Sequence, residues 1–208
     1  MNILNSLNWR YAVKKFNNDK VPQNDIDELI EAVRLTPSSY GLQPFKLIVV
    51  ESDDIRSELL QHSMGQDKVK ESSHLFIFAY ENNFNESHIN EYFQLFSQQR
   101  NISQEQLAGF QEHVKSAILG LPEQDKKNWA INQTYVALGN LLTVAALKQI
   151  DTCPMGGFVA DGFDRVLGLS EKQLSCAVIC AIGYRSTLDE SSSYTKVRLS
   201  HDHFVEIV

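Results

Sequence analysis

The sequence predicts an α+β fold, in which helices pack on a small sheet. Three stretches have strand character: residues 45–51 are rich in β-branched side chains, and residues 75–80 and 174–184 are nearly continuous apolar runs. The segments around them carry apolar residues at helical spacing, in the order helix, strand, helix, strand, helices, strand and tail. No repeat or obvious linker divides the 208 residues, so we expect one domain over residues 1–208.

The composition is that of an ordinary globular protein with an acidic balance. Hydrophobic residues make up 43% of the chain, and the formal net charge of -7 disfavours nucleic acid and anionic membrane as partners. We find no apolar leader and no run that approaches a membrane span, so we expect a cytoplasmic protein. Cys153, Cys176 and Cys180 form no C-x-x-C motif, which argues against disulfides or zinc. We expect Cys176 and Cys180 to share one strand face with Val178 as small core residues.

The N-terminal part is expected to hold a short helix, a cationic turn and an amphipathic helix. Residues 2–9 can form one or two helical turns. Arg10 and Lys14 follow, four positions apart, and on a helix-like turn they would point the same way. Asn24 is expected to cap a helix with regularly spaced apolar residues, which Pro37 ends.

The middle of the chain is expected to be helical around the second strand. Ser52 can cap a helix after the first strand, and residues 64–70 resemble a polar loop or helix end. Residues 82–127 predict an excursion of one or two helices, whose aromatic residues are more often core than site. Residues 125–149 predict the longest helix, apolar nearly all round in its second half and rich in small residues. We therefore place that helix in the core or at a subunit interface.

The C-terminal part is expected to end in a strand-like tail. Residues 151–158 (DTCPMGGF) predict a turn, residues 161–167 a short helix, and residues 204–208 alternate like a strand. His201 and His203 would lie on one side of that tail. Because no third ligand is near them in the sequence, we expect no metal site.

Residues 36–45 (TPSSYGLQPF) have the composition of a binding loop. Two prolines bracket the stretch, so neither flanking element can run through it. Inside lie the adjacent hydroxyls of Ser38 and Ser39, together with Gly41, on rigid supports. A plain connector between helix and strand explains the same residues equally well.

Two cationic pairs near the ends of the chain point to an anion. Arg10 and Lys14 form the first pair, and Lys196 and Arg198 form the second in an extended segment. With the two serine hydroxyls of residues 38–39 they supply the donors of a phosphate site: a guanidinium fork, point charges and hydroxyls. Each pair taken singly is explained as well by a solvated surface.

The glycine pair Gly156-Gly157 would let the backbone approach a flat ligand closely, with free N–H donors. A turn between helix and strand is the alternative explanation. No G-x-G-x-x-G or P-loop motif is present, so the common nucleotide-binding fingerprints are missing.

Four motifs together resemble the nitroreductase family of FMN-dependent oxidoreductases. They are RYAVKKF, LTPSSYGLQPF, NQTYVALGNLLTVAALKQIDTCPMGGF and KVRL, in this order and spacing. The resemblance, weakest over residues 82–127, implies a central, mostly antiparallel sheet flanked by helices and a homodimer with FMN at the subunit interface. Residues 186–208 would cross as an arm and extend the partner's sheet. Residues 82–127 would cover the flavin site, with one or two aromatics gating the pocket.

The resemblance also implies which residues contact FMN. The phosphate would be held by residues of both cationic pairs, the pyrimidine edge of the ring by Lys14, and the ring face near N5 by residues 154–157. At that edge a cation stabilises the negative charge of reduced flavin. The loop of residues 37–41 would come from the partner subunit. The full set is Arg10, Tyr11, Ala12, Lys14, Pro37, Ser38, Ser39, Gly41, Gln66, Lys68, Pro154, Met155, Gly156, Gly157, Lys196 and Arg198.

Three positions depart from the pattern that the resemblance implies. Glycine stands at position 156, where glutamate is common, and Gly41 replaces an asparagine. Phe45 replaces the tryptophan that usually follows Gln-Pro. Since Gly156 keeps its backbone N–H, we expect FMN binding to survive and acceptor preference to differ.

The activity implied by the resemblance is hydride transfer from NADH or NADPH to flavin N5. A nitroaromatic, a quinone or a similar flat acceptor would then stack on the same face, giving a ping-pong scheme. No protein acid or base would be required. Two alternatives stay open: a dedicated reductase of a dihydropteridine or an enone, and a protein that stores or senses FMN with little turnover.

Overall fold

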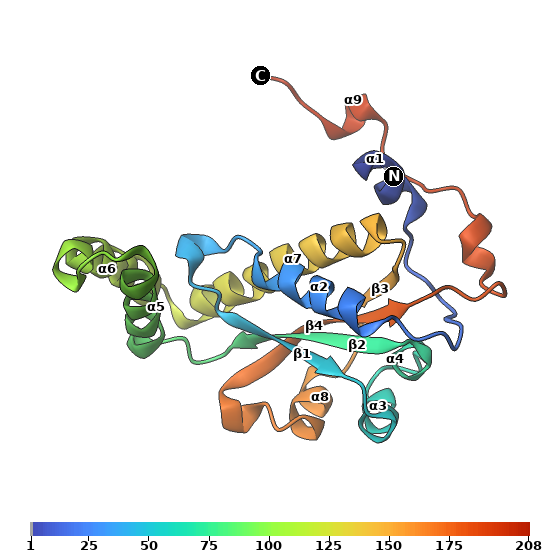
Figure 1. Ribbon diagram of the computed structural model, residues 1–208, viewed down its shortest axis with the longest axis horizontal. Coiled ribbons are helices and arrows are strands. Elements are labelled where there is room, and N and C mark those ends of the chain that lie inside the picture. The colour runs from blue at the N-terminus through green and yellow to red at the C-terminus, as the bar shows by residue number, and fades with distance from the viewer. Residues whose placement is uncertain (1) are drawn as a thin grey trace.

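A four-stranded antiparallel sheet lies at the centre of the protein, between two layers of helices (Figure 1). The computed structural model describes residues 2–208. The strand order is β1-β2-β4-β3, and every neighbouring pair is antiparallel. The strands are β1 (Phe45–Val50), β2 (His74–Glu81), β3 (Asp151–Met155) and β4 (Leu174–Gly183). This architecture confirms the predicted α+β class.

The helices cover the two faces of the sheet and extend beyond it. In Figure 1, α2 and α7 lie over one face and α3, α4 and α8 over the other, while α5 and α6 project past one end. The longer helices are α2 (Gln23–Arg34), α5 (Glu86–Arg100), α6 (Gln104–Leu119) and α7 (Glu123–Leu147). The shorter ones are α1 (Ile3–Trp9), α3 (Asp53–Leu60), α4 (Lys68–Glu71), α8 (Ala160–Val166) and α9 (His201–Phe204). The predicted cap is confirmed at α3, where the Ser52 hydroxyl accepts from the Ile55 N–H.

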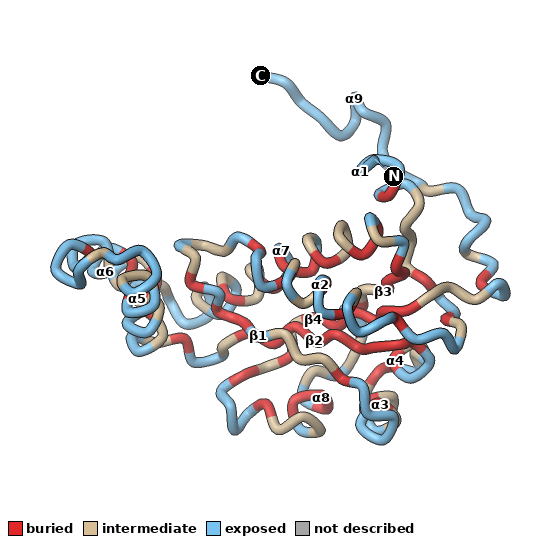
Figure 2. Tube along the Cα trace, in the orientation of Figure 1, coloured by how far each residue is buried: buried red, intermediate tan, exposed pale blue. Residues whose placement is uncertain are grey.

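Each sheet face has its own apolar core, since side chains alternate along the strands. Phe76 and Phe78 of β2 face α2 and α7, where Leu29 and Leu141 are fully buried. Ile77 of β2 belongs instead to the second cluster, on the side of α3 and α8. Burial is concentrated in these two layers, as Figure 2 shows.

A β-bulge places Cys176 on the opposite sheet face from Val178 and Cys180, so the expected shared face is wrong. The register between β2 and β4 shifts at Phe78/Ala79, and an extra residue reverses the alternation. Cys176 therefore packs in the cluster with α8, whereas Val178 and Cys180 pack with α7. The side chain of Asp164 on α8 accepts a 2.7 Å hydrogen bond from the Cys176 N–H beside this bulge. All three cysteines are buried, as expected for core residues.

Three local expectations near the N-terminus and β3 are wrong. Residues 10–16 form no helical turn: Ala12 makes a parallel bridge to Thr152 of β3. Helix α2 is not capped by Asn24: it begins at Gln23, two residues earlier than that cap would give, with Pro22 as its N-cap. Residues 151–155 are a strand rather than part of a turn, because they pair with β4 from Asp151↔Gly183 onward. Such pairings join distant segments, so local turn signals do not reveal them.

The tail and the first strand also differ from expectation. Residues 204–208 form no strand in this chain, and His201 and His203 lie in the short helix α9 instead. Among residues 2–208 no group of three or more His, Cys, Asp or Glu side chains could hold a metal. Strand β1 is an edge strand, buried at its ends but only half-buried or exposed between them, and so less buried than expected.

Helix α7 differs from the expectation that no run of the sequence approaches a membrane span. By length and composition alone it could cross a membrane. Its buried residues, among them Ala137 and Leu141, pack in the core beside the sheet, and a core helix passes the same test. Tyr135, Val136 and Leu147 stay exposed on the same helix.

Helices α5 and α6 form a hairpin with a small core of its own. Both begin with a capping box, formed by Asn85 and His88 in α5 and by Ser103 and Gln106 in α6. These caps satisfy the otherwise free N–H groups of the first turns. The shared core consists of Leu42, Phe84, Ile89, Phe93, Leu107, Val114 and Ile118. That this hairpin covers a flavin site stays a prediction.

Close packing of the turn after α3 on α8 makes Gly162 intolerant of a side chain. A Cβ built at Gly162 would lie 2.3 Å from Cγ of His62, and such overpacking costs about 1–3 kcal/mol. We expect Gly162→Ala to lower the free energy of unfolding by that amount in a urea titration. Gly109→Ala on α6 is the matched control, since its Cβ meets nothing within 4 Å. It should raise stability by up to about 1 kcal/mol, and equal effects of the two variants would contradict this account.

Candidate functional site

A cavity of about 460 Å³ lies where α1 meets the C-terminal segment. Residues from both ends of the sequence line it. The predicted site residues on its walls are Arg10, Tyr11, Ala12, Lys14, Lys196 and Arg198. The structure thus brings together both cationic pairs, which are separated by more than 180 residues in the sequence.

The end of α1 and the C-terminal segment are joined by Lys196. Its Nζ donates to the carbonyl oxygens of Leu7 and Arg10, each at 2.5 Å. A cation at a helix C-terminus satisfies the free carbonyls of the last turn and interacts favourably with the helix dipole. Burial lowers the pKa of Lys196, and the nearby charges of Arg10 and Arg198 lower it further.

Three of the four cations that line this cavity have no acidic partner within the described residues. Arg10, Lys196 and Arg198 form no ion pair among residues 2–208. The buried Nε of Arg10 has no hydrogen-bond partner within the described residues. Burial lowers the pKa of Arg10, and Arg198 also lowers it by repulsion. Gathering like charges is unfavourable unless an anion lies between them. A phosphate, with several charged acceptor oxygens, fits this donor set.

The segment that carries Arg10 to Lys14 is held against the edge of the sheet. The Val13 N–H donates to the Thr152 carbonyl at 3.3 Å, beside the bridge made by Ala12. Further along, the Asn17 N–H donates to the carbonyl of Tyr184 at 2.9 Å. This segment therefore lies along the outer edge of β3.

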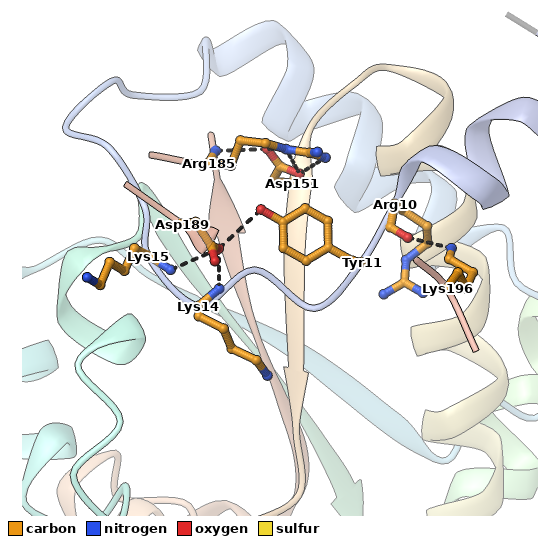
Figure 3. A network of polar contacts seen from close by, with 8 residues as sticks. All are labelled: Arg10, Tyr11, Lys14, Lys15, Asp151, Arg185, Asp189 and Lys196. Atoms are coloured by element: carbon orange, nitrogen blue, oxygen red, sulfur yellow. Dashed lines mark hydrogen bonds and ion pairs between the residues drawn. The ribbon is translucent and has the colours of Figure 1, made fainter. Parts of the chain in front are cut away.

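Asp189 fixes the other side of the segment and was missed by the sequence analysis (Figure 3). Its carboxylate is 2% exposed and accepts from the N–H groups of Lys14 (2.7 Å) and Lys15 (3.2 Å). It also accepts from the Tyr11 hydroxyl (3.1 Å) and the Ser191 N–H (3.0 Å). The only local signal in the sequence is an Asp before a short polar helix, a common N-cap pattern.

An ion pair that the sequence did not predict, between Asp151 and Arg185, lies beside Tyr11 (Figure 3). Asp151 is buried and accepts from the backbone N–H (2.8 Å) and the Nη2 (2.5 Å) of Arg185. The Arg185 guanidinium also lies over the rings of Trp9 (4.1 Å) and Tyr11 (4.6 Å). Burial and the nearby carboxylate of Asp189 contribute to raising the pKa of Tyr11 to about 12, although the Arg185 charge opposes the rise. Tyr11 is therefore a neutral donor at physiological pH.

A second cavity, of about 440 Å³, shares Lys14 with the first as a lining residue. Among its lining residues are Gln66 and Lys68. The Gln66 amide donates to the Gly157 carbonyl at 2.7 Å, which ties this loop to the glycine pair. Gly156 and Gly157 are exposed just after β3, whereas Met155 is buried and Pro154 half-buried. These predicted residues therefore lie near the cation-lined cavity within one chain.

The predicted loop of residues 37–41 borders neither cavity. It connects α2 to β1, far from α1 and the C-terminal segment in Figure 1. The Ser39 N–H donates to Oε1 of Gln133 on α7 at 2.9 Å, and the Ser38 Oγ accepts from the Gln43 N–H at 3.0 Å. Gly41 has a φ of +77°, and a Cβ there would lie 2.7 Å from the Tyr92 hydroxyl. The loop is thus rigidly built, but one chain does not bring it to the cations.

The Asp189 contacts predict an acid-sensitive contribution to stability. Burial alone would raise the pKa of Asp189, but the N–H groups of Lys14, Lys15 and Ser191 and the Tyr11 hydroxyl outweigh it and lower the pKa. Because the folded-state pKa is lowered, the stabilisation is complete above the ordinary aspartate pKa of about 3.9 and disappears as pH falls through the lowered value. We expect Asp189→Asn to cost about 2 kcal/mol at pH 7 and progressively less below about pH 4. Urea titrations of both proteins between about pH 3 and 7 measure this, and a difference independent of pH would contradict it.

The comparisons with known proteins agree with one another. The family model described as "Nitroreductase family" matches residues 7–184. A protein of Staphylococcus saprophyticus, provisionally named an NAD(P)H nitroreductase, is 34% identical over 218 residues, covering 98% of this chain and 95% of that protein. Among solved structures, YdfN of Bacillus subtilis, provisionally called a nitroreductase, is 25% identical with a TM-score of 0.88, covering 99% of this chain and 98% of its own.

A further solved structure shares the fold at lower identity. A protein of Exiguobacterium sibiricum, provisionally called a nitroreductase and solved in complex with FMN, has a TM-score of 0.84 at 16% identity. The match covers all of this chain and 98% of the Exiguobacterium chain. The match of the family model over most of the sequence, with a relative 34% identical from end to end, places this protein in the nitroreductase family.

Proposed function

We propose that this protein binds FMN in the cation-lined cavity and is an oxidoreductase that uses NADH or NADPH. The observation that carries the proposal is the gathering of Arg10, Lys196 and Arg198 without an acidic partner among residues 2–208, around a buried, unpaired Nε. The names of the relatives support the nicotinamide donor, and the FMN-bound neighbour supports the cofactor. Bound FMN would supply the redox chemistry, taking a hydride at N5 and passing electrons to a nitroaromatic, a quinone or a similar flat acceptor.

The chain's own residues would hold and orient this cofactor. Arg10, Lys196 and Arg198 would donate to its phosphate, and the Tyr11–Ala12 backbone would lie along the ribityl chain. Lys14 borders both cavities, so its ammonium group can reach the pyrimidine edge, where a cation favours the reduced, anionic state. Gly156-Gly157 would leave room for a flat ligand near N5, and Gln66 and Lys68 would close the second cavity.

We further propose that the active form is a homodimer in the cytoplasm, built from this one domain. The loop of residues 37–41 would reach the partner's FMN, since it cannot reach the cavity of its own chain. Tyr135, Val136 and Leu147 give α7 an exposed apolar face. The small residue Gly139, also exposed, would let the partner's helix approach this face closely.

The C-terminal tail supplies a second contact in this dimer. Phe204, Ile207 and Val208 are largely exposed in the single chain, as the pale tail in Figure 2 shows. The free edge strand β1 borders a groove of about 610 Å³ lined partly by Ile48 and Ile55. We propose that residues 204–208 of the partner lie along β1 as an added strand. A strand in that place would account for the strand-like alternation of the tail sequence.

The α5–α6 hairpin would cover the cofactor from outside. Tyr40 in the strained loop has a φ of +55° and contacts Phe110 and His113 of α6, with ring centroids 6.4 Å and 6.0 Å away. Phe110 is 40% exposed, so its ring is free to contact a flat acceptor.

Anaerobic half-reactions test the proposed activity. We expect NADH or NADPH to bleach the flavin of the purified protein within one turnover, and menadione or a nitrofuran to restore its colour. Initial rates with both substrates varied should give parallel double-reciprocal lines, as a ping-pong scheme requires. A flavin that neither donor bleaches would refute the enzyme and favour FMN storage or sensing. Turnover with a dihydropteridine or an enone far above turnover with quinones would favour a dedicated reductase.

A further inference from the structure

Asp189 connects two parts of the molecule that the proposed cofactor would need in fixed positions. On one side it receives the N–H groups of Lys14 and Lys15, at 2.7 and 3.2 Å, and the hydroxyl of Tyr11. On the other side it lies at the start of the C-terminal segment, and its carboxylate also accepts a hydrogen bond from the Ser191 N–H. From Ser191 to Arg198 that segment supplies one wall of the cation-lined cavity.

Among residues 2–208, the bond to Asp189 is the one hydrogen bond that the Lys14 backbone makes. Ala12 and Val13 are fixed by Thr152 on the sheet side. On the opposite side the carboxylate of Asp189 is the acceptor for both lysine N–H groups, so it sets the point from which the exposed Lys14 side chain starts. Because Asp189 is 2% exposed, water cannot readily replace it as acceptor.

We infer that Asp189 is a positioning residue of the cofactor site, and this inference rests on the proposed function. Its carboxylate holds the Lys14 backbone and the Ser191–Arg198 wall in one arrangement, so that Lys14 and the phosphate-binding cations act on the same FMN molecule. Asp189 itself need not touch the cofactor. It acts through Tyr11, Lys14 and the wall.

The sign of the expected effect separates positioning from simple electrostatics. Asp189 is an anion at the start of the segment that carries Lys196 and Arg198, which with Arg10 would hold an anionic phosphate. By Coulomb's law alone, neutralising Asp189 would strengthen FMN binding. If it positions these groups, Asp189→Asn weakens binding instead. A neutral amide oxygen accepts more weakly from the three donors that meet at Oδ2, and the amide NH2 would face the Ser191 N–H, which now donates to Oδ1.

The neighbouring carboxylate Glu190 offers a matched control. It is exposed and lies one residue further along the same segment. Within residues 2–208 its side chain makes no hydrogen bond, whereas the Asp189 side chain accepts four. Glu190→Gln changes the same charge by the same amount without touching Lys14, Lys15 or Tyr11. An effect of charge alone therefore has the same sign in both variants, whereas an effect of position appears only in Asp189→Asn.

The test measures FMN dissociation constants by flavin fluorescence for the wild type, Asp189→Asn and Glu190→Gln. We expect Asp189→Asn to bind FMN at least about tenfold more weakly, the loss typical of a hydrogen bond to a charged group. Glu190→Gln should bind as the wild type or slightly more tightly. At saturating FMN, the flavin midpoint potential should fall in Asp189→Asn, because Lys14 no longer favours the reduced state, and stay unchanged in Glu190→Gln. Weaker folding alone would not shift that potential.

Two results would separate failure of the inference from failure of the proposed function. A wild type that binds no FMN would refute the proposed function and the inference with it. Wild-type affinity and potential in Asp189→Asn would overturn the inference and leave the proposed function standing. Should Asp189→Asn not fold, Asp189→Glu keeps the charge and displaces the carboxylate. A lowered potential in that variant would support positioning, and a wild-type value would overturn it.

Discussion

Replacing Lys196 and Arg198 together by alanine is expected to weaken FMN binding roughly thousandfold, or about 4 kcal/mol. Each residue would supply a charge-assisted hydrogen bond to the phosphate, typically contributing about 1.5–3 kcal/mol. Lys196 also holds the C-terminal segment to the end of α1 through the carbonyls of Leu7 and Arg10. Its loss would therefore open the wall of the cavity. Titration of the apoprotein with FMN at low and high salt measures the change.

Salt supplies an internal check on this prediction. Screening weakens exposed charge pairs, and Arg198 is exposed, so wild-type affinity should fall as salt rises and the double variant should respond less. Lys70→Ala with Arg165→Ala is the matched control, since both side chains are exposed and line neither cavity. Equal affinities of the double variant and the control would mean that the phosphate lies elsewhere.

Ending the chain after Ser200 is expected to dissociate the dimer at micromolar concentration. The lost tail carries Phe204, Val205, Ile207 and Val208, and full burial of each such side chain contributes roughly 1.5–3 kcal/mol. A micromolar dissociation constant corresponds to only about 8 kcal/mol, so losing these contacts from both subunits removes most of the driving force. Analytical ultracentrifugation over a concentration series measures the shift.

The same truncation should also weaken FMN binding, because the partner's loop of residues 37–41 leaves with the partner. Asp202→Asn is the control: Asp202 lies in the same tail with a side chain that is 96% exposed, so its loss removes no apolar surface. A truncated protein that stays a dimer at nanomolar concentration would refute the crossing arm. In that case the exposed apolar face of α7 would be the main contact between the two subunits.

The secondary structure was largely predictable because most elements carry their own signal. The apolar run of β2, the helical spacing in α2 and α7, and the serine cap of α3 each lie within one short window of sequence. Strand β3 was mistaken for a turn because its proline and the following glycines dominate that window. Its strand character comes from pairing with β4, which no local pattern encodes.

The candidate site was predictable only as far as charge and resemblance extend. Arg10, Lys196 and Arg198 are visible as cations without obvious acidic neighbours in the sequence. Asp189 and Arg185 are not visible in that way, because their roles arise where the two ends of the chain lie side by side. Whether the cations hold a phosphate, and whether residues 37–41 complete a partner's site, stays a prediction from the sequence.

A crystal structure of the purified protein with FMN tests the central claim most directly. We expect the flavin phosphate at about 3 Å from the nitrogens of Arg10, Lys196 and Arg198. The ring should lie beside Lys14 and Gly156-Gly157, and the loop of residues 37–41 should reach it from the second subunit. FMN bound away from these cations, or a site completed by one chain alone, would contradict the account.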